Sequence, residues 1–93
     1  MPKNCPTCVI ALEELVQEIR TMTTKKYLAP DVAKKMEHEL QEAIAESKKA
    51  EPDSRLIVGK LNGAKTLIEG VASASGLLTD FAETTTKVKR YLQ

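Results

Sequence analysis

Apolar residues recur at intervals of three and four along most of the chain, and this spacing predicts α-helices. No stretch of five residues alternates convincingly between apolar and polar positions, so the sequence predicts an all-α fold without strands. The longest run of this spacing extends from 57 to 92, and nine of its eleven positions are apolar. We call these positions the stripe: Ile57, Lys60, Ala64, Leu67, Val71, Ala74, Leu78, Phe81, Thr85, Val88 and Leu92.

Prolines and charged segments divide this pattern into three predicted helices, each beginning at or beside a proline. The helices are expected at about 6–23, 30–50 and 52–92. Gly76 is the place where the third helix would bend, because glycine ends many helices. The stripe keeps its phase on both sides of Gly76, which favours one long helix. We therefore predict a single helical domain over residues 1–93.

The third helix is too long for the first two to cover. At about 1.5 Å per residue it would extend about 60 Å, whereas each of the others would extend about 25–30 Å. Its remainder must be covered by a second copy, by another helical protein, or by the helix folding back at Gly76. Large exposed apolar patches are rare on monomers, so we predict a bundle completed by homo-oligomerisation. The expected protein-interaction residues are Leu67, Val71, Ala74, Leu77, Leu78, Phe81, Val88, Tyr91 and Leu92.

Four glycines fall within this third helix, at 59, 63, 70 and 76, although each costs up to about 1 kcal/mol in a helix interior. Gly63 and Gly70 lie on one side of the helix, so we interpret them as sites of close approach by a neighbouring backbone. Gly59 and Gly63 also form a GxxxG pair, which is a helix-pairing motif in membranes. Nearby charged residues argue against a membrane location, so we favour close packing in water.

The charges nearly cancel, with 14 basic and 13 acidic residues and a net charge of +1. The one basic cluster, 87–90, suits the negative end of a helix dipole, and three aromatic residues give little material for stacking on bases. The sequence therefore predicts no nucleic-acid partner. The first residues contain no apolar stretch typical of a signal peptide, so we expect a cytoplasmic protein.

Cys5 and Cys8 form a CxxC pair at the start of the first predicted helix, and three interpretations remain open. Two copies meeting at their N-termini would supply the four thiolates of an intersubunit zinc site. A redox pair is the second interpretation, because a helix N-terminus favours the thiolate. In the third, both thiols simply extend the apolar side of the first helix.

No arrangement of residues indicates catalysis. The single histidine, His38, lies among charged residues, and neither a nucleophile motif nor a phosphate-binding glycine loop is present. We predict a non-enzymatic protein without a cofactor, zinc at Cys5 and Cys8 being the one exception considered.

The second half resembles short helical accessory or adaptor domains of bacterial defence and apoptosis-like signalling proteins. The resemblance covers roughly residues 30–92, and it depends on an acidic-Pro-acidic turn, 51–56, followed by the Gly- and Ala-rich segments 63–65 and 70–74. It implies a helper module that assembles through helix–helix contacts. Two alternatives are a membrane-active helical hairpin that uses the Gly-rich segment 59–78 and a small zinc-linked regulator that uses Cys5 and Cys8.

Overall fold

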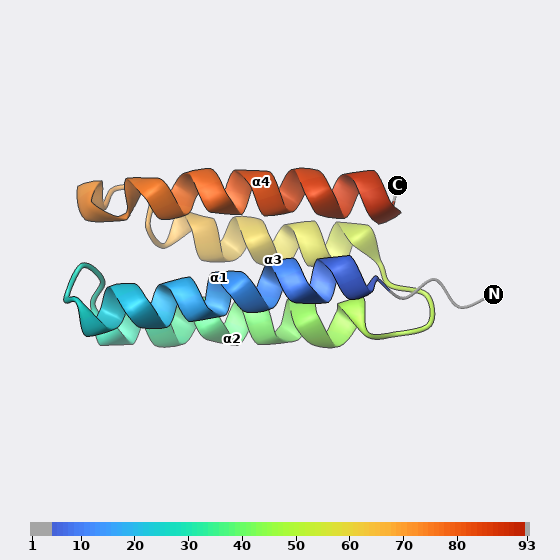
Figure 1. The fold of residues 1–93 in the computed structure, drawn as a ribbon, viewed down its shortest axis with the longest axis horizontal. Coiled ribbons are helices and arrows are strands. Elements are labelled where there is room, and N and C mark those ends of the chain that lie inside the picture. Colours follow the sequence, from blue (N-terminus) through green and yellow to red (C-terminus); the bar gives the residue numbers. More distant parts are fainter. Residues whose placement is uncertain (1–4, 93) are drawn as a thin grey trace.

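Four α-helices and one short 3-10 helix form the fold in the computed structural model, which describes residues 5–92 (Figure 1). They are α1 (Pro6–Thr24), α2 (Pro30–Ser47), α3 (Ser54–Thr66), η1 (Ala72–Ala74) and α4 (Ser75–Leu92). The all-α prediction is confirmed. The three-helix prediction is wrong, because the region expected as one helix over 52–92 contains two antiparallel helices.

Proline and aspartate set the starts of three helices. Pro6 and Pro30 occupy the first positions of α1 and α2. A backbone N–H at this position has no partner within the helix, so its absence in proline costs no hydrogen bond. Asp53 caps α3, since its carboxylate accepts hydrogen bonds from the backbone N–H groups of Arg55 at 2.9 Å and Leu56 at 3.4 Å. The third helix therefore begins two residues after the predicted position 52.

Replacing Asp53 by alanine is expected to lower the free energy of unfolding by about 1 kcal/mol, because the N-terminus of α3 loses its cap. Chemical denaturation followed by circular dichroism measures this change. Asp31 lies in the first turn of α2 and is not the cap residue of that helix, so Asp31→Ala is the matched control with a smaller expected loss. Equal losses in the two variants would contradict the capping role.

The C-terminal end of α2 is tied to the start of α3 by Glu46. Its carboxylate accepts a hydrogen bond from the backbone N–H of Asp53 at 2.9 Å and lies 2.9 Å from Nζ of Lys49. The hydrogen bond from Lys49, followed by that from Asp53, lowers the pKa of Glu46. These contacts fix the second connection of the bundle.

The long predicted helix breaks over 67–71, and the bend predicted at Gly76 is wrong because Gly76 lies within α4. Backbone hydrogen bonds at the end of α3 tighten to the 3-10 type, from Leu67 to Ala64 and from Ile68 to Lys65. Val71 is extended, with φ −99° and ψ 103°. Gly70, a poor helix former, lies within this break.

The break is also held from outside α3 and α4. Ser73 donates a hydrogen bond from its Oγ to the backbone oxygen of Tyr27 at 2.9 Å, which joins η1 to the connection between α1 and α2. Both connections lie at the same end of the bundle (Figure 1). This contact depends on the tertiary fold, so local sequence patterns do not reveal it.

The four helices run antiparallel to their neighbours, and contacts join α1 to α2, α2 to α3, α3 to α4 and α4 back to α1 (Figure 1). The bundle measures 44 × 18 × 17 Å along its principal axes. All four helices contribute to one core, whose largest fully buried side chains include Leu12, Ile19, Met36, Leu40, Ile57, Leu61 and Phe81. No helix within residues 5–92 is long and apolar enough to cross a membrane.

The inward orientation of the stripe is confirmed although its helix is broken. Ile57, Ala64, Ala74, Phe81 and Val88 are buried, and the other six stripe positions are half-buried. The chain covers its own stripe because α4 folds back along α1 and α3.

Candidate functional site

Most of the predicted interaction residues lie on α4, and the structure places them against the same chain. Ala74, Leu77, Phe81 and Val88 are buried in the core. Leu67, Val71, Leu78 and Leu92 are half-buried, whereas Tyr91 is 55% exposed. The premise that these side chains need a second molecule to cover them is wrong in this folded-back form. Homo-oligomerisation itself stays a prediction.

Ion pairs join the first three helices to one another. Arg20 of α1 lies 3.2 Å from Glu37 of α2. Lys60 of α3 lies 3.1 Å from Glu42 and 3.6 Å from Glu39, both on α2. The hydrogen bond to Glu42, together with both carboxylate charges, raises the pKa of Lys60.

Helix α4 lacks such ion pairs to any other helix within residues 5–92. It is held against α1 and α3 by apolar contacts, with Leu77, Phe81 and Val88 at their centre. Its polar interface with α1 instead brings together groups of the same charge. Of the four helices, α4 is thus the one that ion pairs do not fasten to the bundle.

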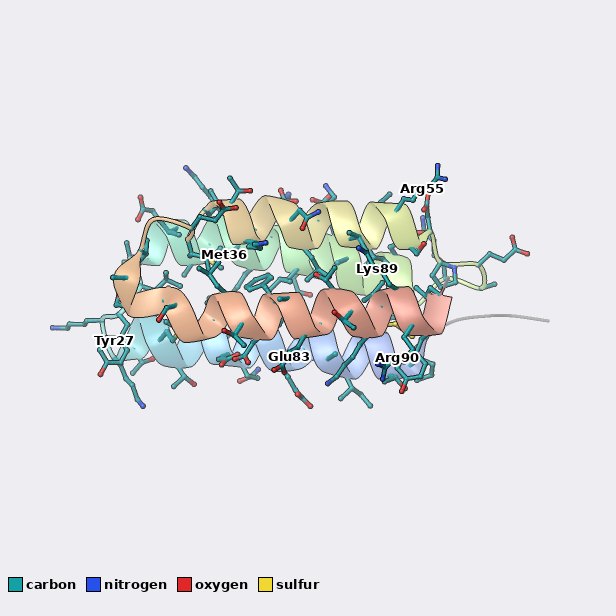
Figure 2. All side chains as sticks on the ribbon, turned by 90° about the horizontal axis from the view of Figure 1, so that it is seen from above. Tyr27, Met36, Arg55, Glu83, Lys89 and Arg90 are labelled. Atoms are coloured by element: carbon teal, nitrogen blue, oxygen red, sulfur yellow. A yellow bond between two sulfur atoms is a disulfide. The ribbon has the colours of Figure 1, made fainter. Side chains whose placement is uncertain are left out.

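A groove of about 320 Å³ separates the polar edges of α1 and α4. Four carboxyl groups line it, and Lys87 is the cation among its lining residues. The lining is Ala11, Glu14, Leu15 and Glu18 from α1, with Asp80, Glu83, Thr84 and Lys87 from α4. Figure 2 shows Glu83 extending from α4 on the side where α1 lies.

Glu18 and Asp80 form a carboxyl–carboxylate pair in this groove. Burial, the hydrogen bond with Asp80, and the charges of Asp80 and Glu14 raise the pKa of Glu18 from 4.5 to about 7. Two carboxyl groups can share a hydrogen bond only when one of them holds a proton. Glu18, in the interface between α1 and α4, therefore changes charge near neutral pH.

The acidic groove was not identified in the sequence, because Glu18 and Asp80 lie far apart along the chain and meet only when α4 folds back. Within the described part of the chain, no group of three or more acidic, histidine or cysteine residues is placed to hold a metal ion. We interpret the groove as a feature of the interface between two helices.

Cys5 and Cys8 are joined by a disulfide, with their Cα atoms 5.1 Å apart. Both belong to the core cluster, as expected if they extend the apolar side of α1. Zinc binding requires free thiolates, so the zinc prediction concerns the reduced chain only and stays a prediction. His38 lies apart from the pair, 3.4 Å from Glu42 on the exposed surface of α2.

The interpretation of Gly63 and Gly70 as sites of close backbone approach is wrong. A Cβ atom added there would meet nothing within 4 Å, and one added at Gly63 would meet only the side chain of Glu39, at 3.5 Å. No neighbouring backbone approaches either glycine. The Gly-rich segment 59–78 covers the end of α3, the turn and the start of α4, which is where the chain reverses direction.

No family model, curated protein or solved structure matches this chain.

Proposed function

We propose that the chain is a non-enzymatic assembly module that pairs with a second copy of itself by exchanging α4. In the exchanged form, the turn over 67–74 straightens and joins α3 to α4 in one long helix. Helix α4 then packs on α1 and α3 of the other copy, in the place it occupies within its own chain in the closed bundle. Exchange of an identical element between copies is a low-cost route to a dimer.

The observation that carries this proposal is the continuous phase of the stripe across the turn. Its 3,4 spacing passes along the sequence from α3 through 67–74 into α4 without a shift, and in the closed bundle five of the eleven positions are buried and six are half-buried. A turn that only reverses the chain has no need of this phase. A long helix with one apolar side does require a constant phase along its length, and the exchanged form contains such a helix.

The conformation of the turn supports the same proposal. No described glycine has a positive φ, and a side chain at Gly70 would have free space around it. Residues 67–74 therefore hold no feature that excludes a helical conformation. The closed and straightened forms differ chiefly in the torsion angles of a few turn residues and in the hydrogen bond between Ser73 and Tyr27.

The interface of α4 also makes it easy for this helix to leave its own bundle. Leaving the bundle breaks no interhelical ion pair of α4 within the described residues, and it separates the carboxyl groups of Glu18 and Asp80. The apolar side of α4, uncovered when the bundle opens, is buried again against the same surfaces of the second copy. The free energy of exchange is thus dominated by the turn and by the entropy of association.

The pattern-level resemblance to accessory and adaptor domains extends this proposal to a biological role. On that basis the module would serve as a helper in a bacterial defence or signalling system, in the cytoplasm. Its partners would be a second copy and, through the same stripe, another helical protein.

Replacing Gly70 by alanine tests the proposal, because alanine favours the helical form of the turn by up to about 1 kcal/mol per chain. A dimer contains two such turns, so its association constant is expected to rise by up to roughly thirtyfold. Light scattering at high micromolar concentration measures the mass in solution.

Gly59→Ala is the matched control, since Gly59 lies inside α3 in the closed bundle and would stay helical in the exchanged one. We expect this variant to leave the dimer fraction near that of the wild type. Compact monomers for the wild type and for Gly70→Ala alike would overturn the proposal.

A further inference from the structure

The proposed assembly through α4 does not involve the disulfide at the start of α1. Cys5 is the N-cap residue of α1, and its Sγ accepts a hydrogen bond from the backbone N–H of Cys8 at 3.2 Å. Backbone N–H groups and the positive end of the helix dipole stabilise a thiolate at such a position. The helix terminus therefore provides a donor for the negative charge on Cys5 when Cys5 is a thiolate.

The two cysteine residues differ slightly in exposure. Cys8 is completely buried, whereas Cys5 retains 5% exposure at the end of the helix. Disulfide exchange begins when an external thiolate approaches one sulfur of the bond. Both cysteines are buried, so of the two we infer that Cys5 is the one an external thiolate attacks and Cys8 the one that leaves.

An apolar groove of about 300 Å³ lies at the same end of the bundle as the disulfide. Pro6, Val9 and Ile10 of α1 line it together with Ser47 and Lys48 at the end of α2. The backbone N–H of Cys5 donates a hydrogen bond to the oxygen of Ser47 at 3.2 Å, so Cys5 contacts one of the residues that line the groove. Ile10 is 58% exposed, which is high for a large apolar side chain.

We propose that Cys5–Cys8 is a thiol–disulfide exchange site whose substrate is a dithiol in a peptide or protein segment with apolar residues beside its cysteines. The groove supplies the apolar contact with that segment, and Lys48 adds positive charge at its edge, where the attacking group is an anion. A small dithiol without apolar residues would react at the sulfur but gain nothing from the groove.

The reaction is an exchange of two electrons and two protons. A substrate thiolate attacks Sγ of Cys5, the Cys5–Cys8 bond breaks, and Cys8 leaves as a thiolate that takes up a proton. The second substrate thiolate then attacks the first substrate sulfur in the mixed disulfide and releases Cys5 as a thiolate. The substrate ends as a disulfide, and Cys5 and Cys8 end reduced.

Alkylation of the reduced protein by iodoacetamide at pH 6 tests the cysteine assignment. We expect Cys5 in the folded chain to react at least tenfold faster than Cys8, and also faster than Cys5 of the same protein unfolded in urea. If Cys5 reacts no faster in the folded chain than in urea, or if dithiothreitol reduces the disulfide only after unfolding, the pair is a structural crosslink and the proposal fails.

Oxidation of a synthetic dithiol peptide with leucines beside its cysteines tests the substrate class. Ile10→Asp is expected to slow exchange with this peptide several-fold more than it slows exchange with dithiothreitol. Leu56→Asp is the control, because Leu56 is exposed on α3 and does not line the groove, and it should leave both rates near the wild type. An equal effect of Ile10→Asp on both reagents would overturn the peptide dithiol as substrate. Neither result depends on whether α4 is exchanged.

Discussion

Phe81→Ala is expected to lower the free energy of unfolding by about 3–5 kcal/mol, the largest effect of any single substitution considered. Phe81 is completely buried and is the largest side chain of the core. Truncation removes its apolar contacts and leaves a cavity that the neighbouring helices fill only in part. Domains of this size are stable by roughly 5–15 kcal/mol, so the variant is expected to lose a large share of its stability.

Denaturation in urea, followed by circular dichroism, measures the loss for Phe81→Ala. Tyr91→Ala on the same helix is the matched aromatic control, since Tyr91 is 55% exposed and its truncation should cost less than about 1 kcal/mol. Similar losses for the two variants would show that α4 does not pack on the bundle through Phe81.

Glu18 is expected to make the bundle less stable as the pH rises towards 7. Its pKa is about 7 in the folded chain, above the ordinary 4.5 of the unfolded chain. Its contribution is therefore fully present below pH 4.5 and is lost progressively as the pH rises through about 7. One pKa unit corresponds to about 1.4 kcal/mol, and partial contact with water reduces the effect, so we expect a loss of about 1–2 kcal/mol.

Glu18→Gln isolates this contribution from the other titrating groups, some of which act in the opposite direction. Glu46, for example, has a lowered pKa and loses its contribution as the pH falls. The glutamine variant should match the wild type in stability near pH 4 and exceed it at pH 8. Glu13→Gln is the control on an exposed part of α1 outside the groove, where the difference should stay constant. A constant difference for Glu18→Gln as well would contradict the carboxyl pair.

Much of the fold follows from the sequence because its causes are local. Pro6 and Pro30 begin α1 and α2 as predicted, since a proline at the first helical position needs no nearby partner. The inward side of each helix also follows, because 3,4 spacing determines which residues share a side. The sequence therefore predicts which residues are buried better than it predicts what covers them.

The position of the break does not follow from local pattern. Gly76 is followed by an Asp-x-x-Glu segment that resembles the start of a helix, whereas the actual turn depends on Gly70 and on the contact of Ser73 with Tyr27. The stripe continues through the turn without a shift in phase, so it offers no signal of a break. If α4 is exchanged between copies, this ambiguity reflects two forms that the same sequence supports.

The candidate site was predicted only in part, for a related reason. The apolar residues of α4 were identified because they follow a period, whereas the pairing of Glu18 with Asp80 exists only once α4 lies beside α1. The cysteine pair shows the same limit. Its spacing allows zinc, redox and packing interpretations, and the contacts with Ser47 and the adjoining groove become visible only in three dimensions.

A crosslinking experiment between two single-cysteine chains tests the exchange of α4 most directly. One chain carries Glu18→Cys and the other Asp80→Cys, both with Cys5 and Cys8 replaced by serine, because positions 18 and 80 line the same groove between α1 and α4. The double variant in one chain is the positive control, since it should form the crosslink readily. Mixed and oxidised at high micromolar concentration, the two single-cysteine chains should give a covalent dimer on a non-reducing gel. A crosslink in the double variant that stays within one chain, with no mixed dimer from the single variants, would contradict the exchange.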